Sequence, residues 1–572
     1  MLGGSKVNGI VMMLIAIAVL GGAYLIYGRW LAKTWGIDPK AKTPAYEMQD
    51  GVDYVPASPG VIFGHQFASI AGAGPINGPI IAAMFGWVPV LLWILIGGVF
   101  FGAVQDFASM YASVKNKGRS IGYIIELYIG KAGKRLFLLF VWLFSILVIA
   151  AFADIVAGTF NGFNADGTFN SANGSTAATS LLFIAAAVIF GIFTYYKKPS
   201  SLVAFAAGLV LVVICIGLGL AFPIHVPKTA WLYFVFAYVF VASITPVWAL
   251  LQPRDYLNSF LLVTMMFFAV IGIFVANPSI ELPAFTGFNV NGQMLFPVLF
   301  VTIACGAVSG FHALVASGTS SKQIRNEKDM LPISFGAMLL ECLLAVISLV
   351  TVGALAVGGK MPEGTPPVIF AQGISNFIGI LGIPQNAAFT IITLSVSAFA
   401  LTSLDSVARV GRLSFQELFI DDEVDEKNIS SLRKLCTNKY FATIITLILG
   451  YLLAVGGYQN IWPLFGSANQ LLSALALIAL AVFLKKTNRK GFMLWAPMVI
   501  MLTVTFTALS QSIIKILNKL LITHDFVIYS DGLQLIFAVL LMALGFLVAI
   551  SGFRKIVEKE SINTVEAAAL NE

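Results

Sequence analysis

The sequence contains few charged residues. Only 11% of its 572 residues are Asp, Glu, Lys or Arg, whereas 59% are hydrophobic and the mean hydropathy is +0.91. Soluble domains carry about 25% charged residues. The composition therefore excludes a soluble globular protein and indicates an all-α polytopic membrane protein with no sizeable soluble domain.

Residues for metal, redox or covalent chemistry are equally scarce. The chain has four cysteines and four histidines, and neither set matches a zinc-binding or disulfide spacing. No GxxxxGK[ST] loop, HExxH pair or GxSxG turn is present. We therefore expect no enzyme activity, no cofactor, no nucleic-acid partner and no obligate protein partner. Membrane lipid and a small solute are the expected partners.

Long apolar stretches fill most of the chain, and about 20 apolar residues suffice to cross a bilayer. The first stretch lacks the basic leader of a signal peptide and is interpreted as a span. A further stretch, 366–382, is expected to be re-entrant or interfacial. The sequence predicts fifteen spans, at 8–27, 62–85, 89–112, 136–159, 180–196, 200–222, 230–251, 256–277, 295–318, 332–357, 388–417, 439–457, 461–484, 492–517 and 532–553.

The distribution of positive charge orients these spans. When the loops are assigned alternately to the two faces, one face holds 27 of the 34 lysines and arginines and the other holds five. Cytoplasmic loops are enriched in Lys and Arg. The pattern therefore predicts an external N-terminus and a cytoplasmic C-terminus, and it accounts for the net charge of +7 without nucleic-acid binding.

The stretch 60–85 cannot form one regular helix. Gly72, Gly74 and Gly78 lower helix propensity, and Pro75 and Pro79 each remove a backbone donor. We expect two half-helices, about 62–70 and 76–85, joined by unwound backbone. Such backbone is tolerated at membrane depth only where protein buries it or water lines it, and in transporters it forms the substrate site.

A second interrupted span lies at 295–318. Its segment 303–312 aligns weakly with 70–79, with small residues at the centre of both. The predicted topology runs the two spans in opposite directions, which is typical of LeuT-like inverted repeats. The second interrupted span follows the first by seven spans where the minimal plan has five, so two are additional. The expected units are 1–61 (extra helix and cytoplasmic loop), 62–294 and 295–484 (the two repeats), and 485–572 (helix pair and polar tail).

The breaks supply the candidate substrate site. Half-helix N-termini carry partial positive charge and free amide donors, which suit a carboxylate. The candidate substrate-binding residues are Gly72, Gly74, Pro75, Asn77, Gly306, Ser309 and Gly310.

Ionisable and hydroxylated residues inside spans are candidates for ion coupling. Either a proton or sodium is possible, with sodium expected at Ala71, Thr402 and Ser403. Structural alternatives remain open: Asp405 with Arg409 as an i,i+4 pair, Asp106 with the basic loop 115–119, and Glu341 bonded to a neighbouring helix. The candidate coupling residues are His65, Ala71, Asp106, Thr402, Ser403 and Asp405.

Several stretches together resemble the carbon starvation protein A (CstA) family of bacterial membrane proteins. The resemblance implies membership of the amino acid–polyamine–organocation superfamily, a location in the bacterial cytoplasmic membrane, and uptake of peptides or pyruvate when carbon is scarce. The stretches are Asp53-Tyr54-Val55-Pro56, Phe63-Gly64-His65, Ile70-Ala71-Gly72-Ala73-Gly74-Pro75, Gly102-Ala103-Val104-Gln105-Asp106-Phe107, Pro253-Arg254-Asp255-Tyr256-Leu257, Cys305-Gly306-Ala307-Val308-Ser309-Gly310-Phe311-His312 and Trp462-Pro463-Leu464-Phe465-Gly466.

A secondary active transporter explains the inverted broken helices and the sparse intramembrane charge. The alternatives are an uncoupled channel or facilitator and a transporter-like nutrient sensor. No selectivity ring stands out, and the polar tail is short for a signalling domain.

Overall fold

The computed structural model describes residues 7–50, 54–164, 166–197, 199–246, 249–420 and 431–558. Parts of the expected linker 418–438 and of the polar tail lie outside these residues. In the described part the fold is almost wholly helical, with one two-stranded antiparallel ribbon. A chain this apolar must satisfy its backbone groups within each segment, and the α-helix does so.

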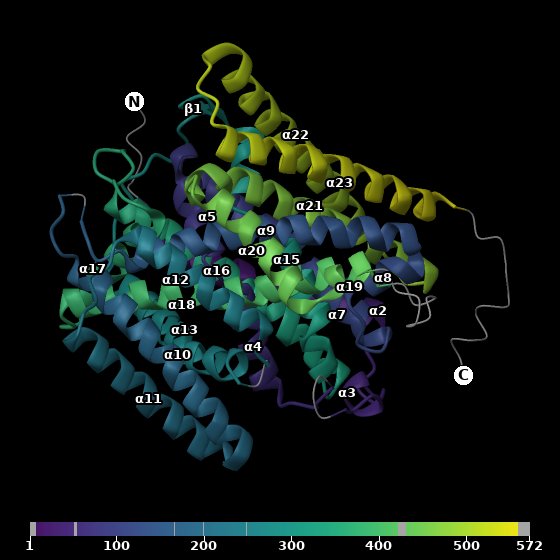
Figure 1. Cartoon of the computed structure of the whole chain (residues 1–572), viewed down its shortest axis with the longest axis horizontal. Helices are drawn as coiled ribbons and strands as arrows, with labels where there is room; N and C mark the ends of the chain where they lie inside the picture. The colour runs from purple at the N-terminus through teal and green to yellow at the C-terminus, as the bar shows by residue number, and fades with distance from the viewer. Residues whose placement is uncertain are drawn as a thin grey trace.

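The helices follow the apolar stretches of the sequence (Figure 1). Short 3₁₀ and π turns extend several of them. The elements are α1 Gly9–Gly22, α2 Arg29–Trp35, α3 Pro44–Glu47, α4 Pro59–Ile70, α5 Gly74–Ala82, α6 Trp87–Gly97, α7 Val104–Lys115, α8 Ile121–Tyr128, α9 Lys131–Phe160, α10 Ser171–Lys197, α11 Ser201–Ala221, α12 Lys228–Ile244, α13 Leu251–Ala276, β1 Asn289–Val290, β2 Gln293–Met294, α14 Leu295–Thr302, α15 Gly310–Gly318, α16 Ala337–Leu355, α17 Pro366–Gly379, α18 Gln385–Glu417, α19 Ser431–Thr437, α20 Lys439–Ala454, α21 Tyr458–Lys486, α22 Trp495–Asn518 and α23 Leu533–Val557.

Both expected breaks are present. The first span bends by 44° between α4 and α5, where residues 71–73 leave the helix. The second half-helix begins at Gly74, two residues before the expected position, because proline is well tolerated in the first turn of a helix. The second span is interrupted over residues 303–309, between α14 and α15.

The two breaks pack directly against each other. A Cβ atom added at Gly74 would overlap the side chain of Cys305, and one added at Gly78 would lie 2.6 Å from the carbonyl oxygen of Thr302. Gly306 of the second break likewise lies close to the first break, because a Cβ atom added there would lie 3.5 Å from the Cα of Pro75. Glycine at these positions therefore serves close approach of two backbones rather than flexibility.

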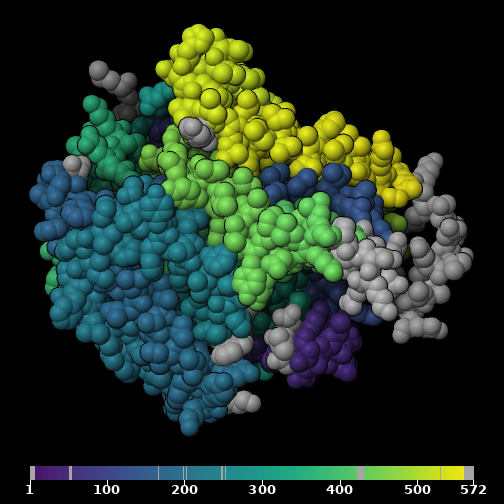
Figure 2. Space-filling view, viewed as in Figure 1, coloured from purple at the N-terminus to yellow at the C-terminus, as the bar shows by residue number. Residues whose placement is uncertain are grey.

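Long helices surround this contact. Helix α21 is wholly buried over its apolar central stretch. Helices α9 and α18 are mostly buried and pack along each other. Helices α1, α11 and α13 are the least buried of the long apolar helices, as expected of elements at the lipid-facing side. Helices α22 and α23 cover one edge of the molecule (Figures 1 and 2).

Each predicted span coincides with a helix or a broken helix. Eleven helices of the described part are long and apolar enough to cross a membrane alone, and the total rises to 13 if each sharply bent pair counts as one span. The remaining counterparts are the 17-residue α12 and the interrupted pair α14 and α15. The count of fifteen crossings stays a prediction. The stretch 366–382 forms α17, which is largely buried.

The predicted orientation can be tested at two exposed positions, Lys486 and Glu363. The four native cysteines are buried, so background labelling should be weak. We expect a membrane-impermeant maleimide added to intact cells to label Glu363→Cys and to label Lys486→Cys only after the cells are opened. The reverse pattern would contradict the predicted topology.

Candidate functional site

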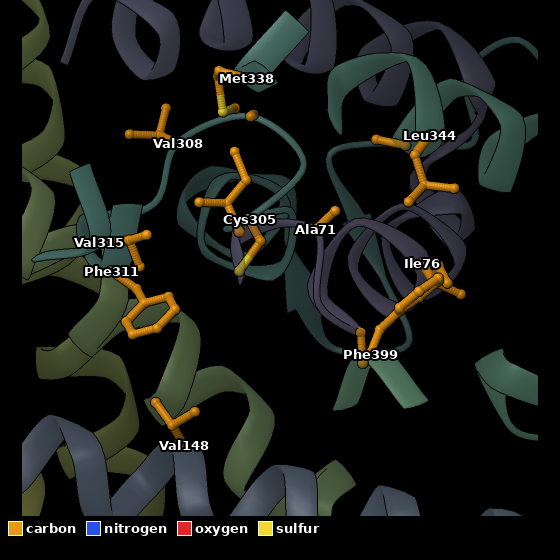
Figure 3. Close-up of a cluster of buried hydrophobic side chains, with 14 of the residues drawn as sticks. Ala71, Ile76, Val148, Cys305, Val308, Phe311, Val315, Met338, Leu344 and Phe399 are labelled. Carbon is orange, nitrogen blue, oxygen red and sulfur yellow. The ribbon is translucent and has the colours of Figure 1, made fainter. Parts of the chain in front are cut away.

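A small cavity lies where the two breaks meet. Its volume is about 20 Å³, room for about one water molecule. Figure 3 shows Cys305 of the second break beside Ala71 of the first, with the ring of Phe311 directed toward Val148 of α9. The lining residues are Ile70, Gly72, Phe144, Val148, Phe152, Cys305, Phe311, Ser403, Val407, Phe465 and Asn469.

Two half-helices begin at this junction, α5 at Gly74 and α15 at Gly310. Within the described residues, the amides of Gly74 and Gly310 make no hydrogen bond. A helix N-terminus carries about +0.5 elementary charge on such amides. The junction therefore places two partly positive helix ends, with unpaired donors, close to one apolar cavity.

Asn469 of α21 holds the second break in place. Its Oδ1 atom accepts from the amide of Phe311 at 3.2 Å, and its Nδ2 atom donates to Ser309 Oγ at 3.1 Å. On the other side of the break, Gln105 Nε2 of α7 donates to the carbonyl of Ser309 at 2.6 Å, and Gln105 Oε1 accepts from Ser473 of α21. These bonds fix the unwound backbone between α7 and α21.

The predicted substrate residues fall into two groups. Gly72 lines the cavity. Gly74, Pro75 and Gly306 form the contact between the breaks, and Gly310 packs against the backbone of α21 at Asn469 and Ser473. These four shape the site without lining it.

Ser309 and Asn77, the two polar residues among the predicted substrate ligands, also do not line the cavity. Ser309 lies in the hydrogen-bonded network with Asn469. Asn77 is fully buried, and neither atom of its amide has a partner among the described residues. Asn77 therefore stays a candidate substrate ligand on α5, although it does not line the cavity.

Asp405 does not pair with Arg409, so that expectation is wrong. The Asp405 carboxylate accepts from Tyr238 of α12 at 2.7 Å and pairs with Arg254 of α13. Arg409 instead donates to the carbonyls of Ala242 and Thr245 at 2.9 and 2.5 Å. The last carbonyls of a helix lack intrahelical partners, and those of α12 draw the guanidinium away from its own helix.

The residues expected to bind sodium have different neighbours in the structure. Ser403 lies against the first break, since a Cβ atom added at Gly72 would be 2.6 Å from its hydroxyl oxygen. The Thr402 hydroxyl faces the other way and accepts from Asn258 Nδ2 at 2.8 Å. Ala71 is fully buried at the break.

Asp106 does not pair with the basic loop 115–119. Its Oδ2 atom lies 3.0 Å from His312 Nδ1 of α15, and Glu341 Oε2 of α16 lies 3.2 Å from His312 Nε2. All three side chains are fully buried. The sequence indicates Asp106 and Glu341 separately, but it does not indicate that they meet at His312. His65 is half-buried on α4 and makes no hydrogen bond with this cluster in the described structure.

Known proteins resemble this chain over most of its length. The family model described as carbon starvation protein CstA matches residues 8–361 and 357–508. A peptide transporter CstA of Bacillus subtilis is 30% identical, with 96% of this chain and 97% of that protein aligned. A pyruvate/proton symporter BtsT of Escherichia coli is 32% identical, with 87% of this chain and 80% of that protein aligned.

The fold also matches a solved structure. A manganese transporter of Eremococcus coleocola superposes with a TM-score of 0.50 at 12% identity, covering 89% of this chain and 99% of that one. At this identity the likeness concerns the fold alone, and it agrees with the LeuT-like arrangement of two broken helices. The extent of the family match and the identity to its members establish that this chain belongs to the carbon starvation protein CstA family of membrane transporters.

Proposed function

We propose that the protein takes up a small carboxylate of the pyruvate type together with a proton, by alternating access across the bacterial cytoplasmic membrane. The observation that carries this proposal is that two half-helices begin next to residues that line one cavity. Helix α5 begins at Gly74, two residues after Gly72, and α15 begins at Gly310, one residue before Phe311. Unpaired amides at two positive helix ends favour an anionic group.

The wall of the cavity favours a small substrate. Four phenylalanines, Phe144, Phe152, Phe311 and Phe465, surround a space of about 20 Å³. A three-carbon carboxylate needs modest movement of these rings, and its short apolar end suits them. The B. subtilis and E. coli relatives are named a peptide transporter and a pyruvate/proton symporter.

Short peptides are the second candidate, because a peptide carries the same carboxylate at its C-terminus. The helix ends would hold that group in the same way. A peptide needs a larger space, however, and therefore a larger displacement of the phenylalanine rings.

The geometry favours the proton over sodium. Sodium sites are built from several oxygen ligands around the ion, as are those of other hard cations. Here Asp405 already pairs with Arg254, and Thr402 accepts from Asn258. Of the expected sodium ligands Ala71, Thr402 and Ser403, Ser403 is therefore the residue whose hydroxyl group lies against the first break.

The substrate site can be tested by filling the cavity. In Gly72→Ala the added methyl would lie 2.6 Å from Ser403 Oγ, whereas the same change at Gly64 of α4 meets no atom within 4 Å. We expect Gly72→Ala to reduce uptake of labelled pyruvate at least tenfold and Gly64→Ala to change it less than twofold. Initial rates in proteoliposomes, normalised to inserted protein, measure both.

The same assay with a labelled dipeptide distinguishes the two substrate classes. Pyruvate uptake unaffected by Gly72→Ala would place the substrate elsewhere. Dipeptide uptake without pyruvate uptake would select the second candidate.

The coupling ion can be tested with imposed gradients. We expect an inward proton gradient without sodium to drive accumulation of substrate above equilibrium, and an inward sodium gradient at equal pH to drive none. The variant Thr402→Ala, at a residue that does not line the cavity, should keep proton-driven accumulation if it remains inserted. Accumulation driven by sodium alone, and lost in that variant, would establish sodium coupling. Substrate entry that only equilibrates under either gradient would indicate an uncoupled facilitator.

A further inference from the structure

Three ionisable side chains meet at full burial on the far side of the second break from the cavity. His312 lies on the first turn of α15, Asp106 on α7 and Glu341 on α16, and none is exposed. The imidazole is held between the two carboxyl groups, one at each ring nitrogen, at 3.0 and 3.2 Å.

The two carboxyl groups are held unequally. Asp106 makes a hydrogen bond with His312 Nδ1. Glu341 lies within ion-pair distance of Nε2, but neither of its oxygens has a hydrogen-bond partner in the described structure. A buried carboxylate without hydrogen bonds is costly, and taking up a proton removes the charge. Glu341 is therefore the member of the cluster best placed to exchange a proton.

Charge balance leads to the same residue. An imidazolium between two carboxylates leaves a net charge of −1 inside the membrane. One further proton, on Glu341, makes the cluster neutral: His312 positive, Asp106 negative and Glu341 uncharged. Ionisable groups inside membranes are costly and mark ion pathways, so two states that differ by one proton are what a proton carrier needs.

The surroundings do not supply another counter-charge. Cys342 follows Glu341 on α16 and Cys305 lies in the second break, and both carry buried thiols rather than cations. Helix α4 packs against α15 and α16, and its titratable side chain, His65, forms no ion pair with the cluster. Within the described residues, no lysine or arginine forms an ion pair with Asp106 or Glu341.

Helices α1, α5, α6 and α17, which pack against α16, contain no charged or titratable side chain. The other neighbours carry Tyr111 and Lys115 on α7, Tyr123, Glu126 and Tyr128 on α8, and Tyr458, Lys485 and Lys486 on α21. In the described structure none of these side chains pairs with the cluster. The cluster is thus left to balance its own charge.

The same turn of α15 contacts the substrate cavity. Ser309 and Phe311 are held by Asn469, which lines the cavity, while His312 one residue later is held by Asp106. Gln105, adjacent to Asp106 on α7, donates to the carbonyl of Ser309. A change in charge at His312 and a substrate at the cavity therefore act on one short segment of backbone.

We propose that His312, Asp106 and Glu341 form the proton-carrying site of this transporter, with Glu341 as the carboxyl group that is protonated from the outer side and deprotonated toward the cytoplasm in each cycle. The assignment rests on the proposed proton-coupled uptake. His312 keeps its proton as a positive charge between the carboxyl groups, and Asp106 positions it.

Hydroxyl groups mark a route from the cluster toward the predicted cytoplasmic face. Ser109 and Ser113 follow Asp106 at i+3 and i+7, so all three share one face of α7. Ser109 Oγ is buried without a partner among the described residues, and Ser113 Oγ donates to Ser321 Oγ at 2.8 Å beyond the end of α15. A proton released from the cluster leaves along this face to cytoplasmic water.

The test separates proton-driven accumulation from substrate exchange, with labelled pyruvate and the full chain in proteoliposomes. Exchange of external label for internal unlabelled pyruvate needs no net proton movement. We expect Glu341→Gln, which imitates the protonated carboxyl group, to exchange within about twofold of wild type but to accumulate nothing above equilibrium. A proton gradient of one pH unit should drive about tenfold accumulation in wild type for one proton per substrate, since a factor of ten is one pH unit.

A second readout is the pH dependence of exchange. Raising the pH should slow exchange in wild type, because Glu341 must be protonated for the loaded protein to cross. Exchange by Glu341→Gln should not depend on pH in this way. Glu327→Gln is the matched control, because Glu327 is also buried but pairs with Lys115 outside the cluster. It should accumulate substrate as wild type does.

Each outcome decides the question. Absence of proton-driven accumulation in wild type would refute the proposed function itself. Wild-type accumulation retained in Glu341→Gln would overturn the assignment alone. If Glu341→Gln fails to insert, Glu341→Met, whose side chain has a similar length and also cannot ionise, takes its place with the same expectation. A variant that inserts normally but loses exchange as well as accumulation would make the cluster a structural element and would also overturn the assignment.

Discussion

The close contact between the two interrupted helices is the constraint on which the rest of the structure depends. Two unwound segments can remain at membrane depth only if protein surrounds them, and here each covers the other. Gly74 against Cys305 and Gly78 against the carbonyl of Thr302 bring the backbones together. The long helices α9, α18 and α21 then enclose the junction, and the cavity, the helix ends and the cluster at His312 all lie around it.

The buried charges follow a second constraint, which is the cost of charge in hydrocarbon. Insertion scales put a lone Asp or Arg at the centre of a span at about 3 kcal/mol. Arg254 with Asp405, and His312 with two carboxyl groups, reduce this cost in different ways. The first group links α13 to α18 with Tyr238 of α12, and Arg254 lies between Asp405 and Asp255. We assign transport chemistry to the second group because Glu341 has no hydrogen bond in the described structure and His312 lies on the turn of α15 that contacts the cavity.

Much of this architecture was predictable from the sequence, because composition and the Gly/Pro clusters act locally. The span positions and both breaks at 71–73 and 303–309 follow from apolar length and from residues that interrupt helices. The partners of charged side chains were not predictable in this way. Asp405 has Arg409 one turn away, yet it pairs with Arg254, 151 positions earlier. Asp106 and His312 are likewise separated by 206 positions. Spacing within one helix carries no information about which other helix faces it.

Four phenylalanines line a cavity of about 20 Å³, and this affects what a binding experiment measures if the proposed substrate binds there. Such a substrate would need a form of the protein in which the rings have moved. If such a form is populated at about 1%, the apparent dissociation constant is about a hundredfold weaker than the contacts in the filled site would give. Weak equilibrium binding would then reflect the scarcity of the receptive conformation. Substitutions that let the rings move more easily would strengthen the apparent affinity without adding a contact to the substrate.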